Sequence, residues 1–378
     1  MQLEEKVSKS LYRTILCTAG FLIWWTSFFI IRTDFNNILP AYIMSDMRYL
    51  GIIVAVISLF LLDKFYLRRL IIGVAILVCI LLNNDLLGNE GLYLDFSILL
   101  ICAVGIDIEK FLKICFYWLL GCMVFVFICI KVKILPDEII YSGQRYRHYL
   151  GYNWVSFAAQ YYLYLIALAI TVLKKRASIL LIIGLELINI YIYFKTKTSS
   201  PFALTTLALF GWLLMNLGAK FMEKKLTRNL LYVIIPFGGV LVTYLSRNYL
   251  RFTELNTFLS GRLVLGYNAL IKYSIGLIGK PISLSSEMNV IGQEYTFVDS
   301  SVLSYLINFG IISFLVLSIA HILLIKRAYL ERKYYFLLAL ALVMLNGLFD
   351  PQLTEPHFNL FLITLATLFQ PINKEVKS

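Results

Sequence analysis

Long apolar runs recur along the whole chain, and they constrain its fold more than any other feature. A helix of about 20 apolar residues spans the hydrocarbon core of a bilayer. We expect an all-α, polytopic integral membrane protein, a single membrane domain over residues 1–378 with about 12 transmembrane helices. The runs lie near residues 12–31, 47–62, 70–87, 91–106, 111–130, 151–173, 178–194, 200–219, 229–246, 299–325, 334–349 and 357–370.

The composition agrees with this class of protein. Hydrophobic residues make up 60% of the chain, whereas a soluble domain is about half apolar. The formal net charge is +12, which in a soluble protein would suggest nucleic acid as a partner. In a membrane protein, basic residues of the cytoplasmic loops are the commoner cause, so we expect no nucleic-acid binding.

The distribution of Lys and Arg predicts the orientation. When both termini are placed in the cytoplasm, the short outer loops carry almost no basic residues, as the positive-inside rule requires. This orientation leaves two long extracytoplasmic loops, at 131–150 and 247–298. The larger loop contains "FLSGRLVLGYNALIKYS", which predicts an amphipathic helix with Ser260 as its N-cap and with Leu263, Tyr267 and Leu270 on one stripe.

Five arginines lie on this outer side, where basic residues are disfavoured. A guanidinium binds phosphate through paired hydrogen bonds and keeps its charge at any working pH. We therefore expect these residues to bind a lipid pyrophosphate, although anchoring to ordinary phospholipid headgroups is the alternative for any one of them. The five are Arg145, Arg147, Arg247, Arg251 and Arg262; nearby side chains that can contact sugars are Tyr267, Asn268 and Asn153.

Acid and base groups on the same side are few. His357 can act as a general base near neutral pH, and it lies close to Glu355 and Asp350 in "GLFDPQLTEPHFNLF". Asp299 precedes a span, where a carboxylate is either a helix cap or a functional group. Glu186 and Asp95 lie within apolar runs and leave a transport path open as an alternative.

Motifs for other chemistries are absent from the sequence. It contains no phosphate-binding glycine loop for nucleotides and no HExxH metal motif. The six cysteines all fall within expected spans, three of them at a spacing of seven residues that suits helix packing better than metal binding. We expect no metal and no cofactor.

Four stretches resemble the Wzy-type polymerases of bacterial O-antigen and capsular polysaccharide, which are related to the O-antigen ligases. They are "RYRHYLGYNWVSFAA" with Arg147, Gly151 and Asn153, "LSGRLVLGYNAL" with Arg262, "FVDSSVLSYLINFGII" with Asp299, Ser300 and Gly310, and "EPHFNLFLI" with Asn359. Where that family often has Ser-Arg at an outer turn, this chain has "KTKTSSP", so Lys195 or Lys197 would replace the arginine.

The resemblance implies an enzyme of the bacterial cytoplasmic membrane that polymerises undecaprenyl-pyrophosphate-linked oligosaccharide repeat units at the outer face. It implies that Arg262, Arg147, Arg251 and Arg247 hold the pyrophosphate, and that His357 or Glu355, and after them Asp299, take the acceptor proton. Membrane lipids, a flippase and a chain-length regulator are the partners it implies. A polysaccharide ligase of the same superfold and a flippase or transporter remain as alternatives.

Overall fold

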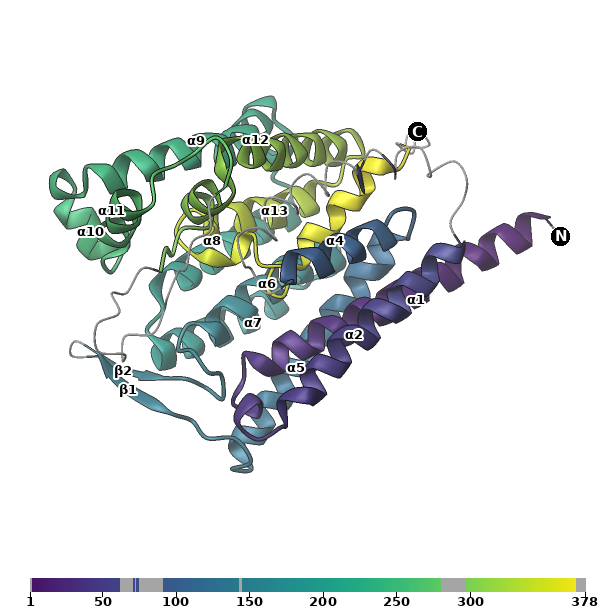
Figure 1. Cartoon of the computed structure of the whole chain (residues 1–378), viewed down its shortest axis with the longest axis horizontal. Coiled ribbons are helices and arrows are strands. Elements are labelled where there is room, and N and C mark those ends of the chain that lie inside the picture. The colour runs from purple at the N-terminus through teal and green to yellow at the C-terminus, as the bar shows by residue number, and fades with distance from the viewer. Residues whose placement is uncertain are drawn as a thin grey trace.

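The computed structural model describes residues 2–61, 71, 73, 74, 91–142, 145–279 and 297–371 of the chain. These residues form a bundle of helices and one two-stranded antiparallel hairpin (Figure 1). Both termini lie at one end of the bundle, which we call the terminal end. The hairpin, α10 and α11 lie at the opposite end, which we call the hairpin end.

The elements follow one another in this order along the chain. The first half contains α1 (Gln2–Ile31), η1 (Asp34–Asn37), α2 (Ala41–Ile57), η2 (Ser58–Leu61), α4 (Leu92–Cys102), α5 (Ile108–Lys131), β1 (Ile139–Ser142), β2 (Arg145–His148), α6 (Phe157–Leu173), η3 (Lys174–Arg176) and α7 (Ile179–Thr196). The second half contains α8 (Ser199–Asn216), η4 (Phe221–Glu223), α9 (Lys225–Arg247), η5 (Tyr249–Arg251), α10 (Thr253–Phe258), α11 (Arg262–Lys272), α12 (Ser301–Leu330), α13 (Tyr334–Asn346), η6 (Pro351–Leu353) and η7 (Leu360–Phe369).

The chain is a multi-pass membrane protein with fewer long spans than the sequence predicted. Among the described residues, seven helices are long and apolar enough to cross a bilayer: Ser10–Ile31, Ala41–Leu61, Ile108–Lys131, Phe157–Arg176, Ile179–Thr196, Lys225–Arg247 and Ser301–Leu330.

The expectation of twelve spans is therefore wrong. The apolar helices α4, α13 and η7 have 11, 13 and 10 residues, short of the roughly 20 that a bilayer needs. The run at 200–219 forms α8, which has 18 residues, begins with two serines and a proline, and is not among the seven. The run at 70–87 lies largely outside the described residues.

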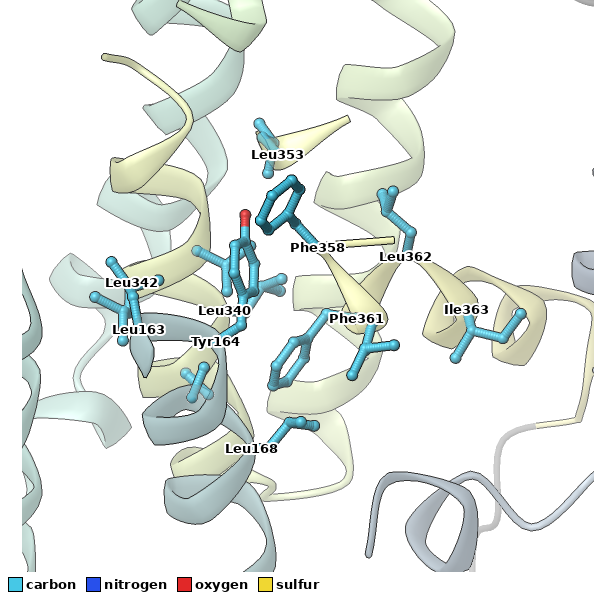
Figure 2. Close-up of a cluster of buried hydrophobic side chains, with 14 of the residues drawn as sticks. Leu163, Tyr164, Leu168, Leu340, Leu342, Leu353, Phe358, Phe361, Leu362 and Ile363 are labelled. Carbon is cyan, nitrogen blue, oxygen red and sulfur yellow. The ribbon is translucent and has the colours of Figure 1, made fainter. Parts of the chain in front are cut away.

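The core of the bundle is built around α6. Side chains on every side of this helix are buried, which is typical of a helix surrounded by other helices. Its Tyr161 stacks on Phe358, from the segment between α13 and η7, with ring centroids 4.5 Å apart. Leu353 of the same segment belongs to the same buried cluster (Figure 2). The segment at 350–359 is therefore fixed to the core by its apolar residues, although it carries several polar ones.

The two long loops contain regular structure. The segment at 131–150 holds the β-hairpin, in which Tyr141 pairs with Tyr146. The loop at 247–298 holds α11, whose Leu263 is buried against Leu245 and Leu259. Ser260 is not the N-cap of α11, as the sequence suggested; Gly261 occupies that position in the left-handed region.

The helix α12 is interrupted at Gly310, which has φ 78° and ψ 176°. The N–H groups of Ile311 and Ile312 donate to the carbonyls of Gly276 and Leu277, at 3.0 and 3.1 Å. The chain after α11 therefore runs beside α12 and replaces hydrogen bonds that the break removes. Lipid-facing backbone must be satisfied by protein in this way.

Gly310→Ala should destabilise the protein, because a Cβ at this position would lie 2.6 Å from the Ile278 carbonyl carbon and the backbone has positive φ. We expect a loss of about 1–3 kcal/mol, measured by thermal unfolding in detergent. Gly184→Ala is the matched control in α7, because its Cβ would meet nothing within 4 Å. That change should leave stability equal or slightly higher. An equal effect of the two changes would contradict this account of the break.

Candidate functional site

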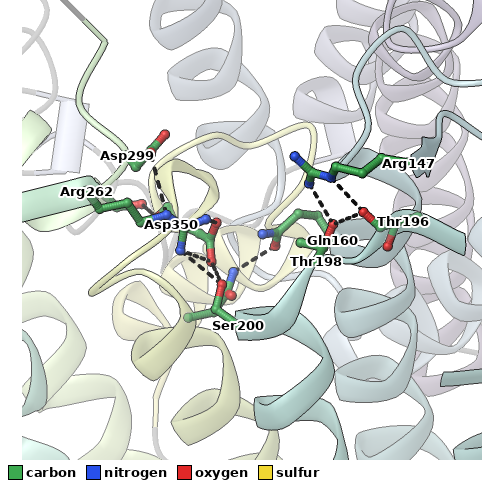
Figure 3. Close-up of polar contacts among 10 residues, drawn as sticks. Arg147, Gln160, Thr196, Thr198, Ser200, Arg262, Asp299 and Asp350 are labelled. Carbon is green, nitrogen blue, oxygen red and sulfur yellow. Dashed lines mark hydrogen bonds and ion pairs between the residues drawn. The ribbon is translucent and has the colours of Figure 1, made fainter. Parts of the chain in front are cut away.

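Arg262, the first residue of α11, is the centre of a polar network at the hairpin end (Figure 3). Its Nη2 donates to Asp350 Oδ1 at 2.8 Å, and its Nη1 donates to Ser200 Oγ at 3.0 Å. Its Nε lies 3.4 Å from Asp299 Oδ2. Ser200 Oγ also donates to Asp350 Oδ2 at 2.7 Å, so the network is closed on itself.

Arg147 of β2 reaches the same region from the hairpin. Its Nε donates to the Thr196 carbonyl at 2.8 Å, and its Nη2 donates to Thr198 Oγ1 at 3.4 Å. Thr198 lies between α7 and α8, and Ser200 is the second residue of α8. Residues two apart have Cα atoms at most about 7 Å apart. The turn at 196–200 therefore brings Arg147 close to Arg262, from a segment more than a hundred residues away (Figure 3).

The charges of this site influence one another. Burial lowers the pKa of Arg147, and the positive charges of Arg145 and Arg262 act in the same direction. Burial raises the pKa of Asp299 to about 6. The positive charge of Arg262 lowers this pKa in part, and the negative charge of Asp350 raises it. Because a guanidinium stays charged, the site presents two cations and a carboxyl that changes protonation near pH 6.

A second charged cluster lies farther along the segment that carries Asp350. Arg32 Nε and Glu355 Oε2 each lie 3.2 Å from His357 Nε2, which can accept from Arg32 or, when protonated, donate to Glu355, but not both. Burial lowers the pKa of His357, and the charge of Arg32 adds to the effect. Burial alone would raise the pKa of Glu355, but the hydrogen bond with His357 and the charges of His357 and Arg32 hold it below its ordinary value.

His357 is poorly placed to accept a further proton. Its side chain is 1% exposed, and its Nε2 is already engaged between Arg32 Nε and Glu355 Oε2. Its Nδ1 is buried and finds no hydrogen-bond partner among the described residues. Of the three acid and base residues expected from the sequence, Asp299 alone combines direct contact with Arg262, partial exposure and a raised pKa.

The other expected arginines are not brought into the Arg262 network. Arg145 is exposed beside Arg147 on β2, and Arg247 and Arg251 are exposed at the end of α9 and in η5. Helix α9 ends at Arg247, and Arg251 lies in the separate short helix η5, so the two arginines do not share one helical face.

Of the three residues expected to contact sugars, two lie on α11 and the third is bound to the end of α1. Tyr267 stacks on Tyr249 with ring centroids 4.8 Å apart, and Asn268 is exposed on α11. Asn153 Nδ2 donates to the Ile31 carbonyl at 2.6 Å, which fixes the end of α1. Asn153 therefore has a structural partner already.

Sequence reasoning missed several members of the two clusters. Ser200 and Thr198 are small hydroxyl residues in "KTKTSSP", the stretch in which a lysine was expected to act. Lys197 instead stacks over the rings of Tyr193 and Phe194. Arg32 was not singled out, although a lone arginine at the outer end of the first apolar run was the available signal.

The intramembrane carboxylates have different partners. Asp95 of α4 forms an ion pair with Arg48 of α2 and accepts a hydrogen bond from Trp24 Nε1 at 3.0 Å. Among the described residues, Glu186 of α7 has only neutral hydrogen-bond partners, Asn189 and Thr206. Because the two carboxylates are engaged with different helices, they do not define a common path through the described part of the bundle.

In the part of the chain that the structure describes, no three His, Cys, Asp or Glu residues lie together as ligands for one metal ion. Comparisons with known protein families, with curated proteins and with solved structures find no match to this chain.

A double-mutant cycle tests whether Arg262 and Asp350 form a true buried pair. Their side chains are 19% and 4% exposed, so removal of one partner leaves a partly desolvated charge. Arg262→Ala and Asp350→Ala should each destabilise strongly, with a coupling of about 1–3 kcal/mol by thermal unfolding in detergent. The control pair Lys174→Ala and Glu109→Ala, which is half exposed, should couple by less than about 1 kcal/mol. Equal coupling in the two pairs would show that the Arg262 network does not stabilise the fold.

Proposed function

We propose that this protein is a membrane glycosyltransferase that polymerises undecaprenyl-pyrophosphate-linked oligosaccharide repeat units at the outer face of a bacterial cytoplasmic membrane. The product is a surface polysaccharide of the capsular, O-antigen or exopolysaccharide kind. One observation supports this function most: the meeting of Arg262 and Arg147 around the turn at 196–200. Two guanidinium groups at one end of a membrane bundle suit a lipid-linked diphosphate.

The hydrogen bonds of Arg262 indicate how a diphosphate would enter. Its contact with Asp299 is long, at 3.4 Å, and the Asp299 side chain is 23% exposed. A phosphate oxygen can replace this carboxylate at Nε while Asp350 continues to hold Nη2 at 2.8 Å. Substrate binding would then free Asp299 from its ion pair next to the reacting bond.

The proposed reaction breaks one bond, forms one bond and transfers one proton. The bond between the anomeric carbon of the growing chain and the pyrophosphate oxygen breaks, and the electron pair leaves with the pyrophosphate. A hydroxyl of the incoming repeat unit forms the new bond to that carbon and gives its proton to a base. We assign this role to Asp299 before Glu355 or His357, because a base with a pKa of about 6 suits proton transfer near neutral pH.

Arg262 and Arg147 would act by charge. They stabilise the negative charge that develops on the leaving pyrophosphate, a contribution that can reach several kcal/mol in a site shielded from water. The exposed Arg145, Arg247 and Arg251 would attract anionic lipid headgroups to the same side of the membrane. A flippase and a chain-length regulator are the partners this function requires, to supply repeat units and to set the polymer length.

The size distribution of surface polysaccharide in a deletion strain tests this proposal. The deletion should leave single repeat units on the surface, and the wild-type gene should restore the ladder of longer chains. Arg262→Ala and Asp299→Asn should both fail to restore it, and the amount of each protein in the membrane, measured alongside, separates lost activity from lost stability. Lys272→Ala, an exposed cation on the same helix as Arg262, should restore the full ladder as the matched control.

Other outcomes would support other functions. Full-length polymer that stays attached to its lipid would indicate a polysaccharide ligase. Repeat units trapped inside the cell would indicate a flippase or transporter. An Arg262→Ala protein that restores a normal ladder would remove the assigned role of Arg262 and with it the proposed site.

A further inference from the structure

Glu186 lies near the middle of α7, one of the seven long apolar helices. It is seven residues after Ile179 and ten before Thr196, which at 1.5 Å per residue places it about 10 and 15 Å from the two ends of the helix. At that depth a carboxylate is surrounded by hydrocarbon and protein. A carboxyl group in such a place is either protonated or balanced by a positive charge.

The partners of Glu186 in the protein are neutral. Thr206 Oγ1 of α8 donates to Oε1 at 2.7 Å, and Asn189 Nδ2 donates to Oε2 at 3.2 Å. Tyr162 of α6 lies nearby, but its hydroxyl donates to the Leu185 carbonyl at 2.5 Å. Among the described residues, no Lys, Arg or His forms an ion pair with Glu186. Asp95, in contrast, has Arg48.

Asn189 indicates where a compensating charge would lie. Its side chain is buried, with 4% of the residue exposed. Its Nδ2 has three oxygens around it: Thr206 Oγ1 at 3.0 Å, the Phe202 carbonyl at 3.2 Å and Glu186 Oε2 at 3.2 Å. An amide nitrogen has two N–H groups, so three acceptors exceed what it can satisfy. Rotation of the amide would present its own oxygen to the same point.

We propose that Glu186, Asn189, Thr206 and the Phe202 carbonyl form a binding site for a small monovalent metal cation. Carboxylate, hydroxyl, amide and carbonyl oxygens are the ligands that hard cations prefer. One carboxylate balances one positive charge, whereas a divalent ion would leave an excess charge in the bilayer. The site is independent of the Arg262 network and of the function proposed for it.

The position of the site gives the cation a structural role. It joins α7, which supplies Glu186 and Asn189, to α8, which supplies Phe202 and Thr206. These two helices meet at the turn at 196–200, which holds Arg147 and Arg262. A bound cation would therefore restrain the hairpin of α7 and α8 and, through it, the turn.

Sodium is the probe for this site. Purified full-length protein in detergent is melted in NaCl, KCl or choline chloride at equal ionic strength. Sodium should raise the melting temperature of the wild type by roughly 2–5 °C over choline, because a ligand that binds only the folded state stabilises it. Glu186→Gln keeps the shape and hydrogen bonds of the side chain without its charge, and should abolish the sodium effect.

Two further variants keep the test decisive. Thr206→Val removes one oxygen and should weaken the sodium effect. This variant tests the site independently if Glu186→Gln does not fold. Thr243→Val is the matched control, because Thr243 Oγ1 donates to the Gly239 carbonyl four residues earlier in α9, away from the site. It should keep the full sodium effect. In the wild type, sodium should also slow hydrogen exchange in the turn at 196–200.

Three results would overturn the proposal. The first is a wild type that melts at the same temperature in all three salts. The second is a sodium effect that survives both Glu186→Gln and Thr206→Val. The third is labelling of Glu186 by a hydrophobic carbodiimide at a rate that sodium does not change, which would show a carboxyl neutralised by a proton instead of a metal cation.

Discussion

The guanidinium of Arg262 holds together four segments that no apolar packing would align so closely. It joins the start of α11 to Asp299 before α12, to Asp350 after α13 and to Ser200 in the first turn of α8. Asp350 is almost fully buried, so its carboxylate depends on this arginine for compensation. The arrangement of the hairpin end therefore follows from the need to satisfy one buried carboxylate.

Charge is accommodated in three different ways along this membrane protein. Asp95, within the bundle, is paired with Arg48 on a neighbouring helix. Arg262 and its two carboxylates lie at the hairpin end, where partial exposure to water lowers the cost of the charges. Glu186 lies at mid-depth among neutral groups, and it is there that the structure calls for a cation from outside the chain.

The sequence predicted the class of fold, because apolar runs are a local property of the chain. It also predicted an amphipathic helix that begins near Arg262, with Leu263 and Leu270 on the buried side. It did not predict the number of long spans, because polar residues cut several runs short; α13, for example, ends at Asn346, four residues before Asp350.

The candidate site was predicted only in part, because its members come from segments that are distant in the sequence. Arg262 and Arg147 could be named from their position on the outer side, and Asp299 from its place before a span. Their partners could not be named, because Ser200 and Asp350 are 62 and 88 residues from Arg262 in the sequence. Only the packing of α8, α11 and α13 brings them together, and hydroxyl residues in a short turn carry no distinct pattern.

The central claim is that Arg262 and Arg147 bind one diphosphate together. The most direct measurement is the affinity of the purified protein for undecaprenyl pyrophosphate and undecaprenyl monophosphate in detergent. We expect the diphosphate to bind more tightly, and Arg262→Ala and Arg147→Ala each to weaken its binding by about tenfold or more, equivalent to about 1.4 kcal/mol. Equal affinity for the two lipids, or variants that bind as the wild type does, would contradict the account.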